Sequence, residues 1–371
     1  MNSDLHYLSQ IFICSKSENE EEKFVANRFN ATGLLCYAGR LSKHFCLLLI
    51  ILFSITLSVT AQTNTWDGSS SANWNTAANW SLNQVPTAAH DVVIPNGITA
   101  NITVNSAAVC KTLTMNGGTT ANTLTINAPN SLSVTGAISI GAGTGAGDNK
   151  IIAVGTGTLS CASVSIAATG SGTRSSEISI VTGTVNVTGN IAMNDANDYI
   201  RFTGAGLLNI GGNITGGNLI PSTGTVNCNG STAQTITGAT TSSFYNLIIN
   251  KTTTANTVTS SGNAMSVANN LTITQGNLLL QATNANYTIS NDLVIPVGGT
   301  LTHSVNWDIA GRSLNIGGNV IIDGLFTYTV RSHVQMSGTN KTIRTGPLPS
   351  GFSILSLVNT AGTISANGLV T

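Results

Sequence analysis

The sequence predicts an all-β protein, specifically a right-handed parallel β-helix (β-solenoid) with roughly 21 residues per turn. Apolar residues recur in pairs two positions apart, and alternate side chains of a strand share one face. These pairs return at a period typical of solenoids. Only 8% of the residues are charged, while Gly, Ser, Thr and Asn abound, as tight corners between stacked strands require. Crossovers between parallel strands are overwhelmingly right-handed, which gives the expected hand.

Residues 1–40 do not share this pattern. They contain the acidic run Glu18–Glu22 and no repeat, so we expect a non-native upstream extension or a disordered segment. Residues 41–61 follow Arg40 and form an apolar stretch that ends in Val59-Thr60-Ala61. A basic flank, a short apolar core and small residues before the cleavage point indicate a secretory signal peptide. The alternative is a membrane anchor, for which the apolar stretch is short.

Residues 62–100 form a second distinct stretch, which carries Trp66, Trp74 and Trp80. The first turn of a solenoid exposes an apolar end and an unpaired strand edge, and both need to be covered. Large aromatic side chains bury much area per residue. We therefore predict a Trp-rich N-terminal cap, with a sugar-stacking platform as the functional alternative.

Residues 101–371 contain the repeated apolar pairs, and we predict that they form the β-helix. Leu293 is expected to point inward between Leu271 and Leu314, one turn away on either side. Before Val164 the pairs come too close together for one pair per turn, so several faces must contribute. The expected core positions are Leu247, Ile249, Leu271, Ile273, Leu293, Ile295, Leu314 and Ile316.

Cysteine and histidine do not indicate a metal site. Cys110, Cys161 and Cys228 are the cysteines beyond the expected signal peptide, and they are far apart without a CxxC spacing, so neither disulfides nor a zinc site is expected. Cys228 occupies a core position and is expected to be a buried apolar side chain. The histidines do not pair at the spacing of metal ligands either, and no cofactor is expected.

The best candidate for a calcium or catalytic cluster is Asp195 with Asp198, followed by Arg201. Oxygen-rich loops bind calcium, but the EF-hand spacing is missing, and a solvated loop is the competing interpretation. Catalysis on sugars needs two carboxylates on one surface, and no further pair is evident. The formal net charge is zero, so nucleic acid is not an expected partner, and no membrane span is expected in the mature chain.

Two motifs carry a family resemblance. The stretch Trp66-Asp67-Gly68 to Asp91-Val92-Val93-Ile94-Pro95 resembles the opening of large β-helical surface proteins that bacteria export by the type IX route, and it is loosely similar to the start of the G8 domain. The stretch from Gly224 to Asn250 is similar to a repeat of those surface proteins, and it returns more weakly from Val334. The resemblance implies export and β-helical architecture. Because such proteins usually end in a sorting domain, we expect the chain to be truncated at its C-terminus.

Two functions remain open at this stage. The first is a secreted or outer-cell-surface, non-enzymatic stalk or adhesin segment, with polar Ser, Thr and Asn faces that bind extracellular glycans or cell-surface components. The second is a polysaccharide lyase or glycoside hydrolase on the same scaffold, because a fold does not fix a function. The sequence does not give the oligomeric state.

Overall fold

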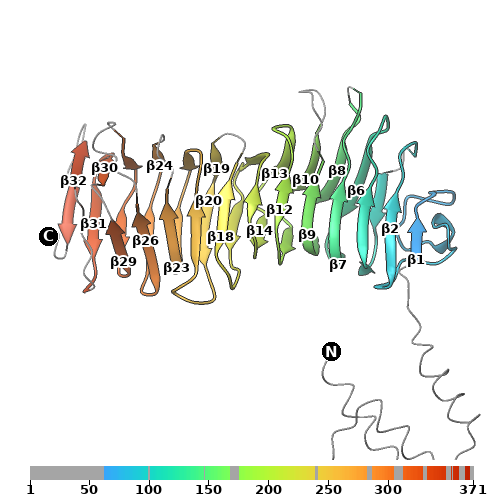
Figure 1. Ribbon diagram of the computed structural model, residues 1–371, viewed down its shortest axis with the longest axis horizontal. Helices are drawn as coiled ribbons and strands as arrows, with labels where there is room; N and C mark the ends of the chain where they lie inside the picture. Colours follow the sequence, from blue (N-terminus) through green and yellow to red (C-terminus); the bar gives the residue numbers. More distant parts are fainter. Residues whose placement is uncertain are drawn as a thin grey trace, which may run out of the picture. The chain divides into compact units, whose positions relative to one another are not determined.

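The computed structural model describes residues 62–98, 101–145, 147–167, 175–238, 241–281, 286–304, 312–328, 332–347, 352, 354–358 and 364–367. The expected upstream extension (1–40) and signal peptide (41–61) lie outside these residues. The described part is a β-solenoid, whose strands stack in parallel from one turn to the next (Figure 1). Its helical structure is a single 3₁₀ turn at Ala77–Asn79. No helix of the described part is long and apolar enough to cross a membrane.

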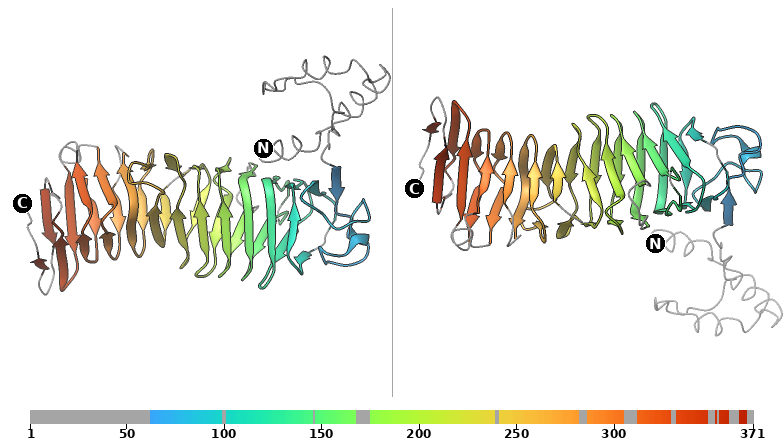
Figure 2. Two further views of the ribbon diagram at one scale, coloured as in Figure 1. Left: turned by 90° about the horizontal axis from the view of Figure 1, so that it is seen from below. Right: turned by 90° about the horizontal axis from the view of Figure 1, so that it is seen from above.

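Each turn of the solenoid contributes strands to three faces, which we number in chain order. Face 1 holds two six-stranded parallel sheets, while faces 2 and 3 are joined in one large sheet because β7, β9 and β23 pair on both faces. Figure 2 shows the stacked strands from two further sides.

Face 1 consists of β3 (Asn101–Val104), β6 (Asn122–Ile126), β8 (Lys150–Val154), β10 (Ser176–Ile180), β13 (Asp198–Phe202), β16 (Asn218–Ile220), β19 (Ser242–Phe244), β22 (Met265–Val267), β24 (Tyr287–Ile289), β27 (Leu314–Ile316), β30 (His333–Ser337) and β32 (Ile354–Val358). Face 2 consists of β4 (Ala108–Cys110), the first halves of β7 (Ser131–Ile140) and β9 (Thr158–Ile166), β11 (Thr184–Val187), β14 (Leu207–Ile210), β17 (Thr225–Cys228), β20 (Asn246–Asn250), the first half of β23 (Leu271–Leu280), β25 (Leu293–Ile295), β28 (Val320–Ile322), β31 (Lys341–Thr345) and β33 (Ile364–Asn367). Face 3 consists of β1 (Gln62–Thr65), β2 (His90–Ile94), β5 (Thr112–Met115), the second halves of β7, β9 and β23, β12 (Ile191–Met193), β15 (Ile214–Thr215), β18 (Gln234–Thr237), β21 (Thr257–Ser260), β26 (Gly299–His303) and β29 (Leu325–Tyr328).

The turns are longer and less uniform than the sequence period suggests. Strands stack about 23 residues apart rather than 21. On face 2 the step is 18 residues from Asn209 to Asn227 but 27 residues from Asp292 to Asn319. The corners absorb this variation, because a corner can take extra residues without disturbing the parallel register of the strands it connects.

The apolar pairs predicted as one ladder belong to different faces, which corrects the expected neighbours of Leu293. Leu293 stacks between Leu271 and Val320 on face 2. Leu314, predicted to be its neighbour, stacks between Tyr287 and Val334 on face 1. The sequence pattern indicates that a strand has an inward side, but it does not indicate which face of the solenoid the strand belongs to.

The solenoid interior is filled by the inward side chains of all three faces. Alternate residues point inward in most strands whose side chains are described, and all eight expected core positions from Leu247 to Ile316 are buried. Val294 is partly exposed on the outside of β25. The pairs before Val164 fall on three separate faces as expected, with Leu113 on face 3, Leu124 on face 1 and Leu132 on face 2.

The three tryptophans form a buried cluster in the N-terminal stretch. Trp80 lies edge-on to both Trp66 and Trp74, with ring centroids 5.0 Å and 4.7 Å apart, and its Nε1–H donates to the Trp74 carbonyl oxygen at 2.7 Å. The large sheet also begins earlier than residue 101, because β1 already pairs in parallel with β2 and β2 with β5. Residues 62–98 therefore combine the tryptophan cluster with the first strands of face 3, and the role of this cluster as a cap stays a prediction.

Candidate functional site: the Asp195 corner and the polar outer faces

Asp195 and Asp198 lie at the corner between β12 and β13, where their carboxylates hold the backbone of the turn. The Asp198 Oδ2 accepts the backbone N–H groups of Asn194 and Asp195 at 2.9 and 3.0 Å. The Asp195 Oδ1 accepts the backbone N–H of Asn197 at 2.9 Å. The Asp195 bond is that of an Asx turn, in which the side chain accepts from the backbone N–H two residues on, and the Asp198 carboxylate accepts from the N–H groups three and four residues before it. Among the described residues, no three His, Cys, Asp or Glu side chains come together to hold a metal ion.

Asp198 points into the solenoid rather than into solvent. It is fully buried, and it is the last member of an inward column on face 1 in which the register stacks Asn122, Lys150, Ser176 and Asp198 on consecutive turns. Burial raises the pKa of the Asp198 carboxyl to about 6, although the two backbone N–H donors lower it. A carboxyl in this position does not face a substrate, which removes the Asp195/Asp198 pair as a catalytic dyad.

The outer surface next to this corner carries a charged cluster on face 1. The Arg201 Nε–H donates to Glu177 Oε2 at 2.8 Å, and the Arg201 guanidinium lies 4.7 Å from the centroid of the Tyr199 ring. The Glu177 side chain is nearly buried, whereas a third of Arg201 is exposed. Sequence reasoning placed Arg201 beside Asp198 but missed Glu177, because the contact depends on the stacking of β10 on β13.

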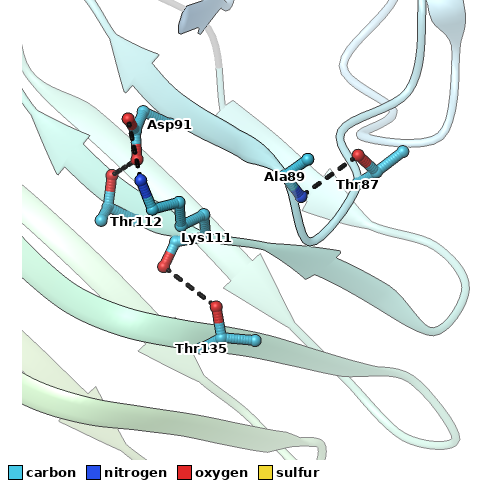
Figure 3. A network of polar contacts seen from close by, with 6 residues as sticks. All are labelled: Thr87, Ala89, Asp91, Lys111, Thr112 and Thr135. Carbon is cyan, nitrogen blue, oxygen red and sulfur yellow. Dashed lines mark hydrogen bonds and ion pairs between the residues drawn. The ribbon is translucent and has the colours of Figure 1, made fainter. Parts of the chain in front are cut away.

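The other ion pairs of the described part also join consecutive turns. Asp91 of β2 accepts a hydrogen bond from the Thr112 hydroxyl of β5, with 2.7 Å between Thr112 Oγ1 and Asp91 Oδ1 (Figure 3). The Lys111 Nζ lies 3.8 Å from Asp91 Oδ2. In the same network the Thr135 hydroxyl donates to the Lys111 carbonyl oxygen at 3.5 Å. Arg344 and Asp323 form a similar pair, at 2.7 Å. These carboxylates are occupied by cations one turn away, so they do not supply the two facing carboxyl groups that glycoside hydrolysis needs.

The outer side of face 2 presents uncharged polar side chains in register. Four of them form a continuous hydrogen-bonded column: Asn186 donates to the Ser160 hydroxyl at 3.3 Å, Asn209 to Asn186 at 2.8 Å, and Asn227 to Asn209 at 2.9 Å. All four are partly exposed. Each amide donates one hydrogen bond in the column and keeps a second N–H, whereas the remaining oxygen of the column's last member, Asn227 Oδ1, is buried. Further along the same face the column is mostly apolar as far as Ile321, with Ile248, Val294 and Ile321 interrupted by Thr272.

The buried tryptophans and cysteines do not face solvent. Trp66 and Trp74 are fully buried and Trp80 is 2% exposed, so the sugar-stacking platform considered for them is wrong. Cys110, Cys161 and Cys228 are unpaired and buried, and desolvation raises the pKa of each thiol to about 12. Thiols with such pKa values stay protonated and unreactive near neutral pH.

Comparison with known proteins gives one partial similarity. Residues 65–147, which include the tryptophan cluster and early strands of all three faces, match a family model described as a domain of unknown function (DUF8693). No curated protein and no solved structure gives a significant match.

Proposed function

We propose that the protein is a secreted or cell-surface β-helical stalk or adhesin segment that binds extracellular glycans without cleaving them. The observation that carries this proposal is the outer column from Ser160 to Asn227, whose side chains are fixed by hydrogen bonds at successive turns. Adjacent members are spaced by about 4.8 Å, as neighbouring strands are. Planar amides and hydroxyls at a regular spacing suit a ligand that repeats hydroxyl groups along its length, and hydrogen bonds to such groups give specificity.

Charge supports a neutral ligand. The formal net charge is zero, and Lys111, Arg201 and Arg344 are each paired with a carboxylate that offsets their charge. Long-range attraction of an anionic polymer is therefore weak. Export is proposed from the sequence of residues 41–61 and from the resemblance to surface proteins of bacteria with type IX secretion, which also motivates a role in cell adhesion.

The test is a glycan-array screen of the purified protein, followed by binding measurements on two variants. Asn186→Ala/Asn209→Ala removes the centre of the column, and we expect it to reduce binding at least tenfold, since each lost hydrogen bond contributes about 1 kcal/mol. Thr302→Ala changes a partly exposed residue of face 3 and serves as the matched control. Depolymerisation of any bound polysaccharide would refute the proposal in favour of a lyase or hydrolase. Equal binding by both variants would remove the column as the site.

A further inference from the structure

One lysine of the solenoid interior faces a side-chain amide on the preceding turn. Lys251 follows β20, is 1% exposed, and its Nζ donates to the Oε1 of Gln234. Gln234 is the first residue of β18 and is 2% exposed. The two side chains therefore meet inside the solenoid, where the turn that contains β18 lies against the turn that contains β20 and β21.

Both partners are held in place by backbone groups. The Gln234 Nε2 donates to the carbonyl oxygens of Ile210 at 3.0 Å and Gly212 at 2.5 Å, which turns Oε1 toward Lys251. The aliphatic part of the Lys251 side chain packs directly against the backbone of Gly276. A Cβ atom at that glycine would lie only 2.5 Å from the lysine Cγ, so no larger residue fits there. The amine and the amide are thus fixed against each other, and a fixed geometry of this kind favours reaction between neighbouring groups.

Among the described residues, the structure gives the Lys251 ammonium no carboxylate partner. Burial lowers the pKa of the Lys251 amine, while the neighbouring Cys228 raises that pKa by a smaller amount. A desolvated lysine in its neutral form is a nucleophile. A neutral amide in the same place would remove the cost of burying a charge.

We propose that Lys251 and Gln234 form an intramolecular isopeptide bond that cross-links two consecutive turns of the solenoid. Lys251 Nζ bonds to Gln234 Cδ, and the Cδ–Nε2 bond breaks. One proton passes from Nζ to the departing nitrogen, which leaves as ammonia, so the reaction needs neither an oxidant nor a reductant. The two carbonyl oxygens that accept from Nε2 hold the leaving group at the start of this path.

Lys150 supplies an internal control. It is also fully buried, and burial lowers its pKa too. Its neighbour in the register, Asn122, also carries a side-chain amide. However, the Lys150 Nζ donates to the backbone carbonyl oxygen of Thr120 and not to that amide, whose Nδ2 donates to the carbonyl oxygen of Pro95. We therefore expect the cross-link at Lys251 and not at Lys150.

The experiment is peptide mapping of the purified full chain by mass spectrometry. We expect a branched peptide that joins the segments around Gln234 and Lys251 and weighs about 17 Da less than their sum, the mass of one ammonia. Lys251→Met and Gln234→Met should each abolish the branched peptide, whereas Lys150→Met should keep it. Quantitative recovery of the two unlinked segments from the unmodified protein would overturn the proposal, whatever the variants do.

A thioester between Cys228 and Gln234 would show the same loss of mass, and it would also overturn the proposal. The Cys228→Ala variant separates the two reactions, because it keeps a lysine cross-link and abolishes a thioester. Hydroxylamine cleaves a thioester but not an amide, so resistance of the linkage to hydroxylamine also supports the isopeptide. None of these measurements depends on glycan binding, so the outcome is independent of the proposed function.

Discussion

Truncation of Leu293 tests the three-face register directly. Its side chain is fully buried and stacks on Leu271 and Val320. Leu293→Ala removes about 2 kcal/mol of transfer free energy, and the cavity left in a stacked interior brings the expected loss to about 3 to 5 kcal/mol of unfolding free energy. Val294→Thr, on the outside of the same strand, should cost less than about 1 kcal/mol, as ordinary surface changes do.

The assay is chemical denaturation of single and double variants. Leu271→Ala and Leu293→Ala remove stacked neighbours, so their effects should be non-additive by about 0.5 kcal/mol or more. Leu271→Ala and Val334→Ala lie on different faces and several turns apart, so their effects should add within about 0.5 kcal/mol. If Val294→Thr proves more damaging than Leu293→Ala, the inward and outward sides of face 2 have been assigned the wrong way round.

Three further outcomes are expected. The folded-state pKa of Asp198 is raised from 3.8 to about 6, so its stabilising contribution is present below pH 4 and is lost as the pH rises to 6. Asp198→Asn should therefore be more stable than the unchanged protein at pH 7, by about 3 kcal/mol at most. Parallel pH–stability curves of the two proteins would contradict this. A chelator should leave the melting temperature unchanged, because the carboxylates of Asp195 and Asp198 bind the turn backbone; a fall of several degrees would restore the calcium hypothesis. Trp66→Ala should cost about 3 to 5 kcal/mol by calorimetry, since it removes a fully buried side chain, and a loss below 1 kcal/mol would show that the tryptophan cluster is not a cap.

The solenoid could be predicted from the sequence because its strongest signal is local. A pair such as Leu271 and Ile273 indicates which side of a strand is buried, and the repetition of such pairs indicates that the strands stack on one another. The assignment of pairs to faces could not be predicted, because Leu293 and Leu314 have the same local pattern and differ only in which corner precedes them. Corner lengths vary with little energetic cost, so sequence spacing alone does not determine the wall on which a strand lies.

The candidate sites were harder to predict than the core because the partners of each polar residue lie one turn away. Asp198 and Arg201 stand close together in the sequence, yet the first points inward beneath Ser176 and the second points outward toward Glu177. Strand alternation explains this separation once the strand is known to begin at Asp198.

The chain thereby places polar groups on both the outer and the inner side of the solenoid sheets. Outside, they are paired between turns and partly exposed, which suits recognition. Inside, groups such as Lys150 and Lys251 are desolvated and must be satisfied by carbonyls or amides, and this requirement makes the Lys251–Gln234 contact a candidate for covalent chemistry.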